Sequence, residues 1–174
     1  GAIGARHVGL PGMSGIARGL AEGLDVRLGV QVAGLVPEGP RWRLSLPDGP
    51  EWFDQVVLAI PAPQAAALLP EGHPLATSAA RARFDPCLTL MAAFPADCPR
   101  PFLTAPDDTA DLSWIAQDSA KPGRPQDRAV AWVAQANPGW SRAHLERTPE
   151  EIAAMMLPML AARIGAQPSQ AIHS

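Results

Sequence analysis

Apolar residues divide the first part of the chain into a helix and several strands. Residues 11–24 carry apolar side chains at helical spacing, and the glycines at positions 12, 15, 19 and 23 form a second face without side chains. A β-branched run over residues 26–36, interrupted by Gly29, predicts two strand segments with a bend between them. Residues 41–46 alternate apolar and polar side chains, which predicts a half-exposed strand that ends at a turn over residues 47–50.

The stretch FDQVVLAIPAPQAAALL, at residues 53–69, predicts a buried strand followed by a helix. Residues 56–60 are all apolar, as in a strand that is covered on both faces of a sheet. We therefore expect half of an α/β sheet with an inserted β-meander. The chain opens at Gly1 rather than Met and stops at Ser174 without a terminating signal. We expect both ends to be truncated, and the exposed edge to favour self-association.

The second part of the chain predicts strands followed by a helix. Residues 84–95, 112–119 and 128–136 are three strand candidates, separated by proline-rich loops. Thr148, Pro149 and Glu151 predict a helix that begins with a capping box, and Pro158 is expected to kink it. Its apolar face comprises Ile152, Met156, Met159, Leu160 and Ile164. We expect a mainly antiparallel sheet backed by this helix, and hence a mixed α/β (α+β) fold.

The composition narrows the class of protein. Of 174 residues, 47% are hydrophobic and 18% are charged, as in a soluble globular protein. A net charge of −3 with scattered arginines gives no basic surface, so no nucleic-acid partner is expected. No apolar run is long enough for a membrane span and no signal peptide is visible, so we expect a cytoplasmic protein without a membrane partner. Cys87 and Cys98 are expected to be reduced thiols.

Few residue patterns could perform a reaction unaided. The histidines show no metal-ligand spacing, so no metal is expected. Ser14 lies in a sequence that departs from the G-x-S-x-G elbow of serine hydrolases, and helix capping is the ordinary role of a serine there. Lys121 and Arg124 flank a Pro-Gly turn, where they could hold an anion or simply lie in solvent.

Large aromatic and flexible side chains suggest where a small molecule could bind. Met91, Trp114 and Trp132 lie within apolar strands, where they pack as core or line a substrate pocket. The alternative to an enzyme is therefore a non-catalytic domain that binds a small ligand in a pocket lined by these three residues.

The order of five motifs carries a resemblance to a known family. VGLPGMSGIARGLAEGLDVRLGVQVAGL, WRLSLPDG, FDQVVLAIPAPQAAALL, DSAKPGR and NPGWSRAHLE follow one another as in the central portion of a bacterial renalase-like oxidoreductase that depends on FAD. That group belongs to the flavin-containing amine oxidase superfamily, whose members also include NAD(P)-binding proteins. The resemblance covers nearly the whole chain.

The resemblance implies a division of the chain and a set of contacts. Residues 1–70 resemble part of an FAD-binding domain without its first βαβ unit, which carries the glycine-rich motif for the pyrophosphate. Residues 71–174 resemble a substrate-binding domain that is truncated at its C-terminal end. The residues that the resemblance places near FAD are Val32 beside the adenine, Gly12, Met13 and Ser14 near the isoalloxazine, and Ala59, Ile60 and Pro61 beside the dinucleotide.

The resemblance also implies a reaction. Monoamine oxidases carry a lysine on the first long strand of the substrate domain, but the comparable CLTLMAAF has none. Renalase-type enzymes oxidise dihydronicotinamide isomers by hydride transfer to flavin, with oxygen as acceptor, and no acid or base of this chain is required. The implied function is oxidation of a small amine or dihydronicotinamide-type substrate. The catalytic residues remain unknown, and the isolated fragment is expected to be inactive.

Overall fold

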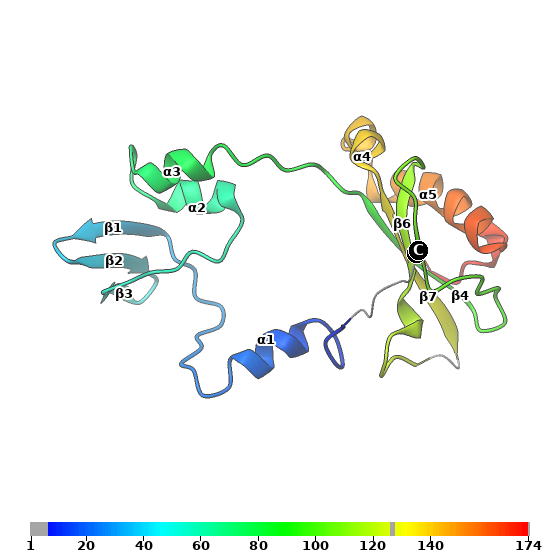
Figure 1. Ribbon diagram of the computed structural model, residues 1–174, viewed down its shortest axis with the longest axis horizontal. Coiled ribbons are helices and arrows are strands. Elements are labelled where there is room, and N and C mark those ends of the chain that lie inside the picture. Colours follow the sequence, from blue (N-terminus) through cyan, green and yellow to red (C-terminus); the bar gives the residue numbers. More distant parts are fainter. Residues whose placement is uncertain (1–6, 126–127, 174) are drawn as a thin grey trace. The chain divides into compact units, whose positions relative to one another are not determined.

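The computed structural model describes residues 7–125 and 128–173 and separates the chain into two compact units (Figure 1). Residues 23–84 form the first, called here the meander unit. Residues 1–22 together with 85–174 form the second, called here the sheet–helix unit. The expected boundary at residue 70 falls inside the meander unit, between α2 (Ala62–Leu68) and α3 (Pro74–Ala79). The assignment of a cofactor portion and a substrate portion on either side of that boundary stays a prediction.

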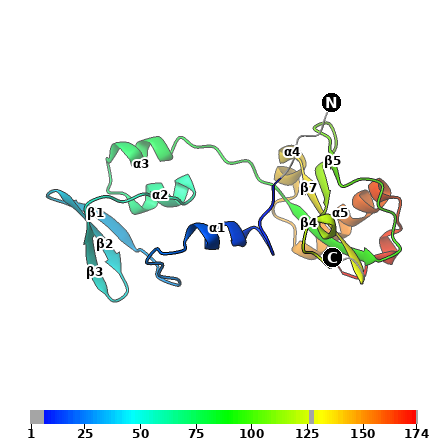
Figure 2. The same cartoon turned by 60° about the horizontal axis from the view of Figure 1, so that its bottom comes forward.

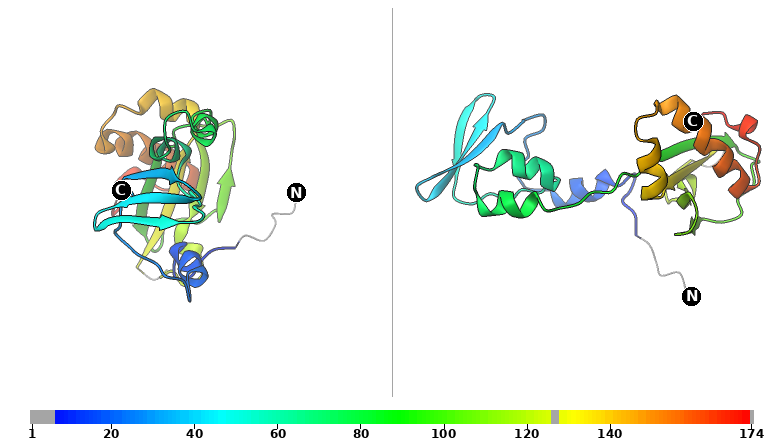
Figure 3. Two further views of the ribbon diagram at one scale, coloured as in Figure 1. Left: turned by 90° about the vertical axis from the view of Figure 1, so that its left-hand side faces the viewer. Right: turned by 90° about the horizontal axis from the view of Figure 1, so that it is seen from above.

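The meander unit contains the expected antiparallel ribbon. Strands β1 (Gly34–Glu38), β2 (Arg41–Leu46) and β3 (Gly49–Phe53) pair in sequence order (Figure 3). Gly39 and Gly49 have φ of 58° and 115° at the two turns, a backbone region that disfavours side chains. On the exposed part of the ribbon, Glu38 accepts hydrogen bonds from Arg43 at 2.6 Å and from the Trp52 indole at 2.8 Å. These two donors, Trp52 first, lower the pKa of Glu38.

Two of the strand predictions for the meander unit are wrong. Residues 26–33 form no strand, so the strand expected over 26–36 is confined to its end. Residues 56–60 also form none, and the side chain of Val57 is 88% exposed. A strand needs partners for its backbone N–H and C=O groups. Within the described part of the chain no named strand pairs with this segment, so its apolar composition alone does not make it a strand.

The sheet–helix unit is built on a four-stranded antiparallel sheet. Its strands are β4 (Thr89–Pro95), β5 (Thr104–Pro106), β6 (Leu112–Gln117) and β7 (Ala129–Ala136), in the order β4-β7-β6-β5. Three of them confirm the strands predicted from residues 84–95, 112–119 and 128–136. Along β7 the side chains alternate between buried and half-buried, because successive residues of a strand face opposite sides of the sheet.

Helix α5 (Pro149–Ile164) covers one face of this sheet (Figure 2). It begins as predicted: the Thr148 hydroxyl accepts from the backbone of Glu151 at 3.2 Å, and the Glu151 carboxylate accepts from the backbone of Thr148 at 3.0 Å. Pro158 lies inside the helix, which runs unbroken between its ends. The predicted apolar face is confirmed. Met156, Leu160 and Ile164 are buried against the sheet, and Ile152 and Met159 pack at the margin of the core.

Helix α1 (Ser14–Leu20) is shorter than the helix expected over residues 11–24, and none of its residues is buried. Its first turn follows a tight bend: a Cβ added at Gly9 would lie 2.6 Å from the carbonyl oxygen of Gly12, and one added at Gly15 would overlap the carbonyl oxygen of Leu10. The remaining elements are α4 (Pro138–His144), η1 (Asp118–Ala120) and η2 (Pro168–Gln170). The described residues thus form two antiparallel sheets with five α-helices, which confirms the mixed α/β class. No helix among them is long and apolar enough to cross a bilayer.

Candidate functional site

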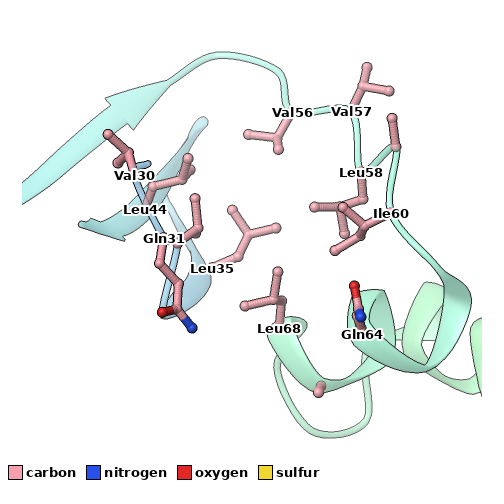
Figure 4. A pocket seen from close by; sticks show the side chains of 13 residues that line it. Val30, Gln31, Leu35, Leu44, Val56, Val57, Leu58, Ile60, Gln64 and Leu68 are labelled. Atoms are coloured by element: carbon pink, nitrogen blue, oxygen red, sulfur yellow. The ribbon is translucent and has the colours of Figure 1, made fainter. Parts of the chain in front are cut away.

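The meander unit carries an open apolar cavity of about 720 Å³ (Figure 4). Three segments line it: residues 30–32 before β1, the extended residues 56–60, and α2. The side chains of Leu35, Leu44, Val56 and Leu58 reach it from the ribbon and from the extended segment. Gln31 and Gln64 are the only polar side chains among its lining residues, and none of those residues is charged. This size is typical of a site for a small molecule.

The cavity brings together residues that the sequence predicted to share a ligand. Val32, Ala59 and Ile60 all line it, although Val32 precedes the ribbon and the other two follow it. Pro61 comes next and is the N-cap residue of α2, where its carbonyl accepts from the backbone of Ala65 at 3.0 Å. Sequence reasoning missed the contribution of α2. The available signal was the spacing of Gln64, Ala67 and Leu68, which lie on one face of a helix directly after the apolar run 56–60.

The other three predicted cofactor residues belong to the sheet–helix unit. Gly12 has no side chain to offer a ligand, and its carbonyl oxygen accepts a hydrogen bond from the backbone N–H of Gly15 at 2.8 Å. Met13 is the N-cap residue of α1, and its side chain is 59% exposed. Ser14 does not cap the helix as expected: its hydroxyl accepts from Arg18 at 3.0 Å.

The sheet–helix unit contains a second, larger cavity, of about 930 Å³, here called the sheet-face cavity. It lies on the sheet face that α5 leaves open, since Trp114 and Gln135 are cross-strand partners, as are Ala116 and Val133. Apolar side chains form most of the wall, and Lys121 contributes a cation. The remaining lining residues come from the chain before α1, from the start of β5, from the end of β6, and from η1 and the loop after it: His7, Val8, Leu10, Leu103, Thr104, Gln117, Ala120 and Pro122.

Of the predicted substrate-pocket residues, the structure places only Trp114 in this cavity. Trp132 lies on the opposite face of the sheet and is fully buried, with its ring edge-on to Phe102 at 5.3 Å between centroids. The pocket role of Trp132 is therefore corrected to a core role, because the alternation along β7 turns residues 130, 132 and 134 toward α5. Met91 is 70% exposed and lines a separate cavity of about 610 Å³ beside the start of α5.

The cations of the loop after η1 are not simply solvated. Lys121 forms an ion pair with Oδ1 of Asp118, and Arg124 lies 3.6 Å from Oδ2 of the same carboxylate. The side chain of Asp118 is 22% exposed. Two partly exposed cations thus share one carboxylate beside the sheet-face cavity.

Other titratable groups serve the fold. Hydrogen bonds from Thr109, and then from Arg163, lower the pKa of Asp107 and tie its loop to α5. Burial raises the pKa of the Cys98 thiol, while Cys87 is exposed. Among the described residues, no group of three or more His, Cys, Asp or Glu side chains could hold a metal ion.

Comparison with known proteins assigns the chain to a family. The sequence profile of the flavin containing amine oxidoreductases matches residues 3–174. The chain belongs to this family. The family description names proteins that contain a flavin. The family does not single out the renalase-like group expected from the motifs.

Solved structures share the fold. A candidate protoporphyrinogen oxidase from Exiguobacterium sp. 255-15 is similar with a TM-score of 0.69, at 23% identity, over 94% of this chain and 38% of that chain. A double mutant of putrescine oxidase is similar with a TM-score of 0.71, at 17% identity, over 94% of this chain and 37% of that chain. The chain therefore spans well under half the length of either protein. At these identities the likeness shows the fold alone.

Proposed function

We propose that the chain is part of a renalase-like oxidoreductase that binds FAD and oxidises a small amine or a dihydronicotinamide-type substrate, with oxygen as electron acceptor. In this proposal the meander unit contacts the cofactor and the open face of the four-stranded sheet contacts the substrate. When bound, the flavin supplies the hydride-accepting chemistry. The residues of this chain bind the cofactor, orient the substrate and exclude water.

One observation carries the cofactor part of the proposal: a single cavity joins Val32 to Ala59 and Ile60. Its lining fits one portion of FAD better than another. An apolar wall with two amide side chains, Gln31 and Gln64, suits a flat ring that carries hydrogen-bonding atoms at its edge. It does not suit a pyrophosphate, which binds where cations or free backbone N–H groups converge. We therefore assign the cavity to the adenine end of the cofactor.

The substrate part rests on the sheet-face cavity and on the chemistry of β4. The exposed positions of β4 include Thr89 and Met91 but no lysine, so this strand offers no amine that could act on water near the flavin. A substrate that needs only to be oriented for hydride loss fits this surface. The non-catalytic alternative assumed one pocket lined by Met91, Trp114 and Trp132, and the structure divides these residues among three environments.

The test is the cofactor content of the full-length protein, with variants in the cavity. Purified protein should be yellow, and heat should release FAD rather than FMN, identified by chromatography. Val32→Asp introduces a carboxylate into the apolar wall and should weaken FAD binding by roughly tenfold or more. Val26→Asp is the matched control, because Val26 is 53% exposed and does not line the cavity. Full-length protein without flavin, or equal effects of the two variants, would contradict the proposal.

A further inference from the structure

We infer that the sheet-face cavity selects ligands that combine a flat apolar ring with an anionic group, and that Lys121 is the residue that recognises the anion. This inference rests on the proposed function, because it names the substrate class of the same surface. It starts from charge and shape in the described residues, and each step can be tested apart from the flavin.

The wall of the cavity fits a flat apolar ring. Trp114 lies half-buried on β6, and its cross-strand neighbour on β7 is Gln135, beside Val133 and Ala116. Small and branched side chains on a pleated sheet leave a shallow, level surface. An aromatic ring gains from stacking on another ring beyond the burial of its area.

The charge at the cavity comes from Lys121, the single lysine of the sequence. The ion pair with Asp118 does not cancel the positive charge here, because Arg124 shares the same carboxylate. The two cations and one carboxylate sum to a net charge of +1, and the lining residues include no carboxylate of their own. A ligand anion that enters the cavity therefore meets attraction from Lys121, which the Asp118 carboxylate offsets in part from outside the lining.

The loop holds this cation in place. Gly123 has φ of 75°, which disfavours a side chain, and a Cβ there would lie 3.3 Å from a methyl group of Leu10. Leu10 also lines the cavity, so the segment before α1 packs against the loop that carries Lys121. The side chain of Lys121 remains 38% exposed and lines the cavity, so a ligand in the cavity can reach it.

The experiment measures binding to the full-length protein by calorimetry, with pairs of probes that differ in charge. Indole-3-acetate is compared with indole-3-acetamide for a carboxylate, and 1-naphthyl phosphate with 1-naphthol for a phosphate. We expect the anion of at least one pair to bind roughly three- to tenfold more tightly than its neutral partner, because a half-exposed charge pair contributes modestly. The preference should shrink as salt is added.

Variants separate a charge effect from damage to the fold. Lys121→Gln should abolish the preference and leave the neutral probe unchanged, whereas Lys121→Arg should retain it. Asp118→Asn removes the competing negative charge and should increase the preference. Arg147→Gln is the matched control: Arg147 pairs with Glu151 at 3.3 Å beside α5, on the covered side of the sheet.

The outcomes are distinct from those of the cofactor test. Failure of all four probes to bind, equal binding within both pairs, or a preference that survives Lys121→Gln would overturn the inference. So would a loss of equal size in Lys121→Gln and Asp118→Asn. If the protein carries FAD and shows no charge preference, only this inference fails. If it carries no flavin, the proposed function fails.

Discussion

Trp132 provides a sharp test of the division between core and cavity. Its indole is fully buried against Phe102 on the α5 side of the sheet, and its Nε1 has no hydrogen-bond partner among the described residues. Trp132→Ala should cost about 3–5 kcal/mol, as for other buried large aromatic residues. Trp132→Phe loses part of the ring, worth about 1–2 kcal/mol of burial. It also removes an unpaired buried donor, worth about 1–3 kcal/mol, so its net effect should lie within about 1 kcal/mol of zero.

Hydrogen exchange followed by mass spectrometry measures this effect locally, in peptides that cover β7. Trp132→Ala should speed the exchange of β7 amides by about two to three orders of magnitude, since each 1.4 kcal/mol is a factor of about ten. Trp132→Phe should leave the exchange nearly unchanged. Trp114→Phe, on the open face, should affect probe binding more than exchange. The placement of Trp132 in the core is refuted if Trp132→Ala weakens probe binding while β7 amides stay protected.

Three further predictions use matched positions. Gly15→Ala should destabilise the start of α1, because its Cβ would overlap a backbone carbonyl oxygen. Gly19→Ala meets open space in the same helix and should stabilise the protein by up to about 1 kcal/mol. Thermal unfolding of the two variants compares these effects. Cys87 should react with a thiol reagent well before Cys98, whose pKa is raised by burial; a faster Cys98 would contradict its buried position. The lowered pKa of Asp107 means that its contribution to stability is present above its ordinary pKa of 3.8 and is lost as the pH falls through the lowered value. Asp107→Asn should therefore flatten the acid end of the stability profile, and an NMR titration midpoint at or above 3.8 would contradict this.

Local patterns predicted the sheet–helix unit well. The capping box at Thr148 and Glu151 and the alternation along β7 depend on neighbours in the sequence, so the sequence contains the information that they need. The same alternation places Trp132 on the face of Val130 and Ala134, but it does not say whether α5 covers that face. Which face a helix covers is a tertiary fact that a single strand does not reveal.

The meander unit shows where such reasoning fails. Residues 56–60 have the composition of a buried strand, yet pairing depends on a partner that the described residues do not supply. Their association with Val32 around one cavity was expected from family resemblance and from no local pattern. The role of Asp118 was missed for a related reason: Lys121 and Arg124 suggested an open cation pair, and only the fold shows that one carboxylate serves both.

The insertion of residues 23–84 between two parts of the sheet–helix unit has a consequence for biosynthesis. The segment with α1 leaves the ribosome before the loop at residues 121–124 that Leu10 contacts has been translated. At about 5–20 residues per second, that segment waits several seconds for its partner. In the interval Leu10 lacks its contact at Gly123, and Met13 and Leu20 are exposed even in the folded chain, so this nascent segment offers chaperones an apolar target.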